Sequence, residues 1–187
     1  DLDRLLQALM TEVQGYFEAE AISVALLEGD RDHLACWIAA REPSAELARL
    51  KLPCDQCICG WVSRNGEPVL LRNAYEDPRF CSSIDDQTGL RTETLLAAPI
   101  VADGGAIGAM EVINPAGDRL SERGLGILNR VAEWAGLAIR RAEMVERARE
   151  RSDELVSESY IVKEAVDEAN VLVRHAESDA TRIRLEA

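Results

Sequence analysis

Four of the five cysteines in this 187-residue chain could bind a metal or undergo oxidation together. Cys54, Cys57 and Cys59 share one short segment, and Cys81 follows in a later polar stretch. Four thiolates can ligate Zn²⁺ or an iron–sulfur cluster, whereas two thiols in contact can form a redox pair. The Cys-x2-Cys-x-Cys spacing is not a standard ligand run, and Cys59 points away from Cys57 if the segment is extended. A metal site is therefore not favoured, and redox chemistry and simple packing as small apolar side chains both stay open.

Three oxygen-bearing side chains are candidate ligand contacts. Glu111 stands in an apolar run between Met110 and Val112, so strand alternation is expected to turn it to the opposite face from those neighbours. Thr88 and Thr92 are four residues apart and would share one face of a helix. A small-molecule pocket needs a few polar groups converging in an apolar wall, which this pattern would supply.

The elements that would position these residues alternate between helix and strand. Apolar residues at helical spacing predict a helix over residues 1–18. Short helices are expected at 45–50 and 60–63. Apolar runs bounded by turn residues predict strands at 21–27, 33–40, 68–71, 95–101 and 107–113, the last two joined by a Gly104-Gly105 turn. Because most strands form hairpins, the expected fold class is α+β with an antiparallel sheet.

The C-terminal third has the pattern of one long helix. From Ser121 onward no proline interrupts the chain, and alternating steps of three and four residues select a mostly apolar seam. Such a heptad predicts a coiled coil, most simply a parallel homodimer, with a single helix folded back on its own domain as the alternative. Trp134 is expected to pack the start of this helix against the domain. The seam residues are Val145, Ala148, Leu155, Val162, Val166, Ala169, Val173, Ala176, Ala180 and Ile183.

Composition excludes several classes of protein. The net charge of −13 argues against non-specific attraction to nucleic acid or to an anionic membrane surface. No apolar run reaches the roughly 20 residues that span a bilayer, and no signal peptide is evident. An odd number of unevenly spaced cysteines does not fit a secreted disulfide framework, so we expect a cytoplasmic protein with reduced thiols. Because the sequence opens at Asp1, we expect a longer parent protein.

A series of motifs gives the sequence a family resemblance. The motifs are Leu52–Val62 with Gly66-Glu67-Pro68, Asn73–Phe80, Asp85–Thr92, Ala98-Pro99-Ile100, Ile107-Gly108 and Glu111–Asn114. In this order they resemble the GAF family, especially the GAF domains of cyclic-nucleotide phosphodiesterases and cyanobacterial adenylyl cyclases. The resemblance implies a six-stranded antiparallel sheet flanked by helices, as in GAF and PAS folds, with a ligand pocket on one face and residues 73–92 as its lid. It also implies a sensory domain over 1–143, followed by a coiled-coil signalling helix over 144–187.

The resemblance assigns candidate pocket residues. Cys59 would lie on the pocket floor, Cys81 on the lid, and Trp61 could stack on a ligand. In cyclic-nucleotide-binding members, residues at matching positions help to line or close the pocket, here Phe80, Asp85, Thr88, Thr92 and Glu111.

The signature of the cyclic-nucleotide-binding members is altered in this chain. Those members continue Asn-Lys, then Phe, then Asp-Glu, whereas here Pro115 follows Asn114, Leu120 replaces the Phe, and Gly124-Leu125 replace the acids. The acidic residue with which those members recognise the purine ring would match a position near Ile38-Ala39, where no side chain can accept a hydrogen bond. Cyclic-nucleotide binding is therefore an alternative and not the first choice.

The expected function is regulatory and not enzymatic. The sequence favours a small-molecule- or redox-sensing GAF domain of a multidomain bacterial signalling protein, which dimerises and relays its signal to a covalently linked output domain. A dimerisation module with a vestigial pocket is a second alternative. The enzymatic alternative is a free methionine sulfoxide reductase. These enzymes share the fold and have a Val-Cys-Gly context that Ile58-Cys59-Gly60 resembles, but their other cysteine motifs are missing from this sequence.

Overall fold

The computed structural model describes residues 2–29, 31–40 and 48–186 of the chain. The chain divides into two compact units, Asp1–Ala142 and Glu143–Ala187. In chain order the elements are α1 Leu2–Phe17, β1 Ala21–Leu27, β2 His33–Ala40, β3 Ala48–Pro53, α2 Ile58–Asn65, β4 Val69–Leu71, η1 Ala74–Glu76, α3 Ser83–Thr88, β5 Leu95–Ala102, β6 Gly105–Ile113, η2 Gly117–Arg119 and α4 Glu122–Glu186.

The first unit is built on a six-stranded antiparallel sheet in the order β3-β2-β1-β6-β5-β4. This architecture confirms the predicted α+β class. Strand β6 lies near the centre and pairs with both β1 and β5, so Glu111 stands opposite Ser23 on one side and Ala97 on the other. The β5–β6 turn is formed by Asp103 and Gly104, both at positive φ, one residue earlier than expected.

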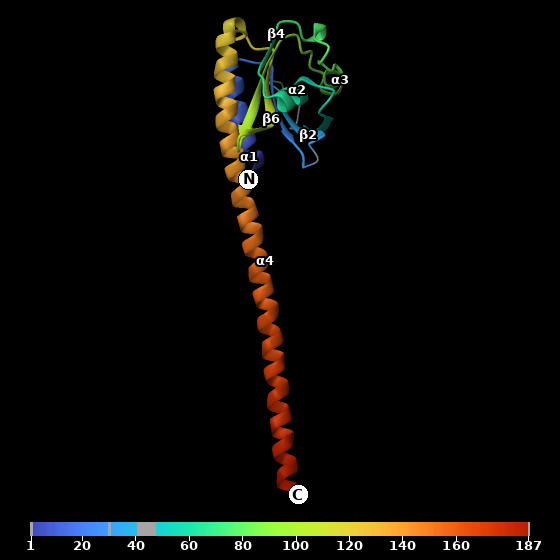
Figure 1. The fold of residues 1–187 in the computed structure, drawn as a ribbon, viewed down its shortest axis with the longest axis vertical. Coiled ribbons are helices and arrows are strands. Elements are labelled where there is room, and N and C mark those ends of the chain that lie inside the picture. Colours follow the sequence, from blue (N-terminus) through green and yellow to red (C-terminus); the bar gives the residue numbers. More distant parts are fainter. Residues whose placement is uncertain (1, 30, 41–47, 187) are drawn as a thin grey trace. The chain divides into compact units, whose positions relative to one another are not determined.

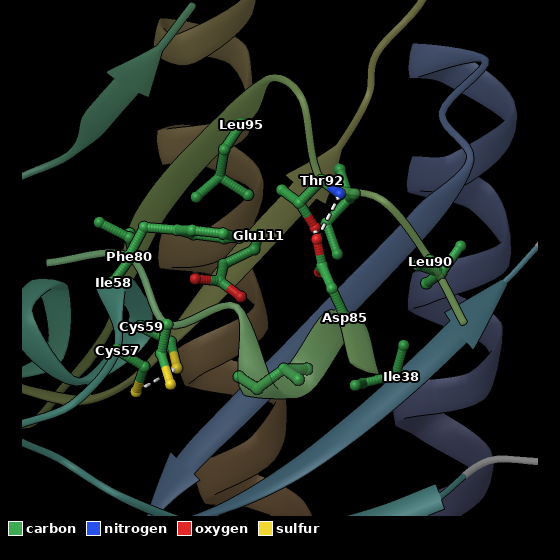
Figure 2. Close-up of a pocket in the computed structure, with 13 residues that line it drawn as sticks. Ile38, Cys57, Ile58, Cys59, Phe80, Asp85, Leu90, Thr92, Leu95 and Glu111 are labelled. Carbon is green, nitrogen blue, oxygen red and sulfur yellow. Dashed lines mark hydrogen bonds between the residues drawn. The ribbon is translucent and has the colours of Figure 1, made fainter. Parts of the chain in front are cut away.

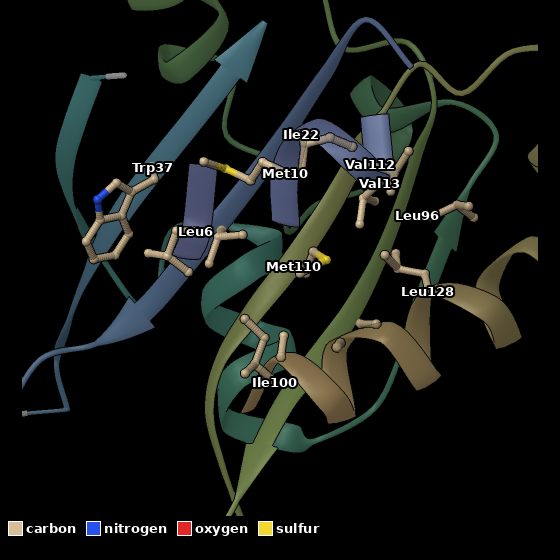
Figure 3. Close-up of a cluster of buried hydrophobic side chains, with 14 of the residues drawn as sticks. Leu6, Met10, Val13, Ile22, Trp37, Leu96, Ile100, Met110, Val112 and Leu128 are labelled. Carbon is tan, nitrogen blue, oxygen red and sulfur yellow. The ribbon is translucent and has the colours of Figure 1, made fainter. Parts of the chain in front are cut away.

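Helices cover both faces of this sheet (Figure 1). Helix α1 and the start of α4 lie on one face and pack on side chains that Figure 3 shows meeting in one apolar cluster. Helices α2 and α3 lie on the other face, over a second apolar cluster that includes three of the cysteines of the sequence motif. The first cluster contains Leu6, Met10, Val13, Ile22, Trp37, Leu96, Ile100, Met110, Val112 and Leu128.

Two local expectations differ from the structure. The predicted helix 45–50 is wrong where it can be checked, because Ala48–Pro53 is the edge strand β3, paired with β2; residues 45–47 lie outside the described residues. Pairing with β2 therefore decides the conformation of this segment. Trp37 is buried as expected, but Trp134 is 72% exposed on α4 and does not pack the helix onto the domain.

The second unit consists of the continuation of α4. From residue 144 to residue 168 its side chains are exposed, including the predicted seam residues Val145, Leu155, Val162 and Val166. The side chains of Ala169, Val173, Ala176, Ala180 and Ile183 lie outside the described part of the chain. Within the described residues, no helix is both long and apolar enough to cross a membrane.

Gly136 sets the distance between α4 and the sheet. A Cβ at this position would lie 2.1 Å from the carbonyl oxygen of Val101 on β5, so the helix approaches the strand backbone directly. Gly126 on the same helix has no atom within 4 Å of its corresponding Cβ position.

We therefore predict opposite effects of the two alanine substitutions on the free energy of unfolding. Gly136→Ala should lower it by about 2 kcal/mol, because the helix must move off the strand. Gly126→Ala should raise it by about 0.5–1 kcal/mol through helix propensity alone. Urea unfolding followed by circular dichroism measures both, and equal effects would show that Gly136 does not set the helix–sheet spacing.

Candidate functional site

A small, partly open pocket lies between the sheet and the lid segment, on the face that carries α2 and α3 (Figure 2). Its volume is about 40 Å³, which is room for roughly two or three water molecules, so a larger ligand must open the lid. The wall is mostly apolar, with two carboxylates and three cysteines. The lining residues are Ile38, Cys57, Ile58, Cys59, Phe80, Cys81, Ile84, Asp85, Leu90, Thr92, Leu95, Glu111 and Ile113.

Glu111 brings a carboxyl group into this wall from the middle of β6. Its neighbours Met110 and Val112 face the helix-covered cluster on the other side, as strand alternation predicted. Burial raises the pKa of Glu111 to about 7, although hydrogen bonds from the Ser23 side chain and the Cys59 backbone oppose that rise. Its side chain lines the cavity, and the residue keeps some accessible surface. Glu111 is thus an acid that can be neutral or charged near neutral pH.

Asp85 holds the lid segment together. Its carboxylate accepts hydrogen bonds from the Thr92 backbone N–H at 2.7 Å, the Thr92 hydroxyl at 2.7 Å and the Tyr75 hydroxyl at 2.8 Å. The bond to Asp85 raises the pKa of Tyr75. The Tyr75 ring packs on Phe80, with centroids 5.1 Å apart. One buried carboxylate therefore joins η1, α3 and the segment that leads into β5.

Asn114 fastens the other end of the lid to the sheet. Its side-chain oxygen accepts from the backbone N–H groups of Glu93 and Thr94, at 2.8 and 2.9 Å. Its amide nitrogen donates to the Arg91 carbonyl at 2.7 Å and to the Glu20 carboxylate. Asn114 itself has a φ of 50°, a conformation that asparagine tolerates better than most residues. The end of β6 thereby fixes the point at which the lid returns to the sheet and β5 begins.

Helix α2 directs its first backbone donors at the pocket. Cys57 is its N-cap residue, and its sulfur accepts from the Gly60 N–H at 3.4 Å. The Cys59 N–H in the same turn is near enough to Glu111 to oppose the rise in the pKa of that carboxyl group. Gly60 packs against the backbone of Cys54, where a Cβ would lie 2.0 Å from the carbonyl oxygen. The first backbone N–H groups of α2, which have no partner within the helix, thus face a thiol and a carboxyl group.

The two sulfurs of Cys57 and Cys59 lie 3.1 Å apart. The sequence predicts that Cys59 points away from Cys57 only if the segment is extended, and this condition is not met, because α2 begins directly after Cys57. Cys81 instead contacts the Ser83 hydroxyl at 3.0 Å, and Cys54 is buried without lining the pocket. Among the described residues, no three cysteine, histidine or acidic side chains are placed to share a metal ion.

The pocket brings together most of the residues proposed from sequence. Cys59, Phe80, Cys81, Asp85, Thr92 and Glu111 all line it. Trp61 does not, because its ring lies under the Arg79 guanidinium, 4.4 Å from the ring centroid. The side chain of Thr88 is outside the described residues. Thr92 follows the helix α3 that ends at Thr88, so the two threonines do not share one helix face as expected.

Sequence analysis missed Ser23 and Tyr75, the partners of the two carboxyl groups. Ser23 could have been found as a hydroxyl inside an otherwise apolar strand. Tyr75 gave no local signal, because its role depends on how the lid folds onto Asp85.

Asp85→Asn should loosen the lid. The amide keeps the shape of the carboxylate but directs two hydrogens at a site surrounded by donors, which should cost about 2 kcal/mol of local stability. Amide hydrogen exchange in residues 75–92 should become about 30-fold faster. The exposed neighbour substitution Asp86→Asn is the control and should leave exchange unchanged. Equal exchange in both variants would show that Asp85 does not close the lid.

Comparison with known proteins identifies the fold and its family. The GAF domain family matches residues 1–139. A dual 3′,5′-cyclic-AMP and -GMP phosphodiesterase 11A from Takifugu rubripes is 33% identical over 114 residues, which are 59% of this chain and 13% of that protein. The chain spans between 6% and 19% of the length of three such relatives.

Solved structures share the fold at lower identity. A methyl-accepting chemotaxis protein fragment, residues 122 to 287, matches with a TM-score of 0.66 and 23% identity over 78% of this chain and 92% of that one. The GAF-B domain of DevS from Mycobacterium smegmatis matches at 0.61 and 18%, over 79% and 99%. A free methionine-R-sulfoxide reductase from Neisseria meningitidis, in complex with its substrate, matches at 0.57 and 18%, over 76% and 83%. With the family matched over most of its length, this chain belongs to the GAF domain family, a ligand-sensing regulatory fold of signalling proteins.

Proposed function

We propose that this GAF domain senses a small neutral or cationic molecule that donates hydrogen bonds to Glu111. The observation that carries the proposal is a carboxyl group in a small, mostly apolar pocket whose described lining residues include no basic side chain. A buried acid with so few partners gains most from a ligand that supplies N–H or O–H donors. The phenyl ring of Phe80 and the surrounding aliphatic side chains would contact the rest of the ligand.

The charge of the pocket argues against a cyclic nucleotide as the natural ligand. A cyclic phosphodiester carries a negative charge, and it would face Asp85 and Glu111 without a described basic lining residue to balance it. The relative from Takifugu is named for hydrolysis of cyclic AMP and cyclic GMP, and cyclic-nucleotide binding remains the alternative that the ligand experiment must address.

Binding is expected to be linked to protonation. A donor-rich ligand favours the carboxylate form of Glu111, whose pKa lies at about 7 in the unliganded pocket. Below that pH the acid must first lose its proton, so affinity should fall about tenfold per pH unit. Above it, the pH dependence from this residue should disappear.

The class of ligand can be determined by measuring how each compound of a metabolite library shifts the thermal unfolding temperature of the protein. Neutral or cationic donors should stabilise the wild-type protein, and Glu111→Gln should remove the effect. Cyclic AMP and cyclic GMP serve as anionic probes and should give no shift. Stabilisation by the cyclic nucleotides that persists in Glu111→Gln would overturn the proposed ligand class.

We propose a regulatory module, acting in the cytoplasm of a bacterium as part of a longer signalling protein with an output domain. Its five free cysteines suit a reducing compartment. An enzyme resembling the free methionine sulfoxide reductases would instead consume free methionine sulfoxide in the presence of dithiothreitol, and such turnover would contradict a purely regulatory role.

The signal would leave through a dimeric coiled coil formed by α4. Leu155 and Val162 are 60% and 62% exposed in the single chain. Both belong to the predicted seam, so one partner helix could bury them together. Lid closure over a ligand would then bias the packing of the two helices, which is a change of population between existing arrangements.

Replacing two seam residues should abolish the dimer. Val162→Lys with Val166→Lys places charges in the seam, and sedimentation equilibrium should show a monomer at micromolar concentration. Ile161→Lys is the matched control, because Ile161 is equally exposed but lies off the seam, at 63% against 62% for Val162. A dimer that survives the double substitution would contradict the seam.

A further inference from the structure

Cys57 and Cys59 form a side-chain pair that the proposed ligand site does not use. Both are free thiols, and their sulfurs lie 3.1 Å apart. A disulfide bond is about 2.05 Å long, so the two sulfurs need to approach by only about 1 Å. Cys81 lines the same pocket and is less buried, but its sulfur contacts a serine hydroxyl and not another thiol.

The surroundings make the two thiols unequal. The Cys57 sulfur accepts a hydrogen bond from the Gly60 N–H in the first turn of α2, shares a hydrogen bond with the Cys59 thiol, and donates to the Pro53 carbonyl oxygen at 3.6 Å. The contacts with Cys59 and Gly60 lower the pKa of Cys57, whereas the contact with Cys57, together with burial, raises the pKa of Cys59. Cys57 is therefore the nucleophile of the pair, and Cys59 the thiol that stays protonated beside it.

The pocket restricts what can reach these sulfurs. Both residues line the cavity of about 40 Å³, and each is otherwise buried, at 6% and 1% exposure. A hydroperoxide as small as hydrogen peroxide fits such a space, whereas a peptide disulfide does not.

We propose that Cys57 and Cys59 are a modification site, at which a small hydroperoxide converts the two thiols into an intramolecular disulfide. The site adds a chemical input to the sensor and does not depend on which ligand the pocket binds.

The reaction proceeds in two balanced steps. The Cys57 thiolate attacks one oxygen of hydrogen peroxide, which breaks the O–O bond, leaves Cys57 as a sulfenic acid and releases hydroxide. The Cys59 sulfur then attacks the Cys57 sulfur, the S–O bond breaks, and water leaves as the Cys59 proton is taken up. Overall, two thiols lose two electrons to one peroxide, which becomes two water molecules.

Disulfide formation would act on the pocket through α2. The Cys57 sulfur is the N-cap acceptor of this helix, and the Cys59 N–H is a hydrogen-bond donor to Glu111. Gly60 packs on the Cys54 backbone with no room for a Cβ, so the first turn of α2 has little freedom to follow the sulfurs. Drawing the two sulfurs together should therefore displace the Cys57 side chain that caps α2 and the Cys59 N–H that faces Glu111.

To test the proposal, the full chain is treated with equimolar hydrogen peroxide and its remaining thiols are alkylated. The protein is then digested with a protease that cleaves before aspartate. Cleavage before Asp55 separates Cys54 from Cys57 and Cys59. We expect the peptide that begins at Asp55 to be lighter by two hydrogens, unalkylated and restored by dithiothreitol. Cys54 and Cys81 should be alkylated in full.

Three variants distinguish this site from oxidation by exposure alone. Cys57→Ser keeps a good N-cap and should slow thiol loss about tenfold or more. Cys59→Ser should stop at a Cys57 sulfenic acid that dimedone traps. Cys81→Ser, the matched pocket control, should behave as wild type. Preferential oxidation of Cys81, or a Cys57–Cys59 pair that stays reduced, would overturn the proposal.

Discussion

Strand alternation on β6 is the constraint on which the rest of this domain depends. Met110 and Val112 must face the apolar cluster under α1 and α4, because that cluster is the larger part of the core. Glu111 is then forced to the opposite face, on a central strand of the sheet that pairs with β1 and β5. The structure meets the cost of burying this carboxyl group with a hydroxyl from β1, a backbone donor from α2 and a small cavity.

The elements around Glu111 follow from that placement. Helix α2 approaches closely enough to donate to the carboxyl group because Gly60 allows it to rest on the Cys54 backbone. The lid closes over the remaining opening through Asp85, which satisfies its own charge with donors from the lid and leaves Glu111 to the cavity. Two carboxylates in one pocket thus have separate tasks, one in closing the pocket and the other in facing its contents.

Most of the sheet could be predicted from sequence, because hairpin strands carry their alternation and turn residues locally. The orientation of Glu111 could be predicted from the alternation of side chains between the two faces of a strand. The helix predicted at 45–50 failed where β3 begins at Ala48, since an edge strand has only one neighbour to bury it and a weaker apolar pattern. The contact between Cys57 and Cys59 could not be predicted, because it depends on the residue at which the chain turns from extended backbone into helix. The same holds for Tyr75 and Thr92, which meet Asp85 only through the fold of the lid.

The central claim is that Glu111 is a buried acid held ready for a hydrogen-bond donor. Infrared difference spectroscopy tests it directly, because a protonated carboxyl group absorbs apart from a carboxylate, and subtraction of the Glu111→Gln spectrum isolates this residue. The account predicts a titration midpoint at about pH 7, with the protonated band lost as the pH rises. A midpoint near the ordinary glutamate value of about 4.3 would show that the side chain is solvated and would contradict the account.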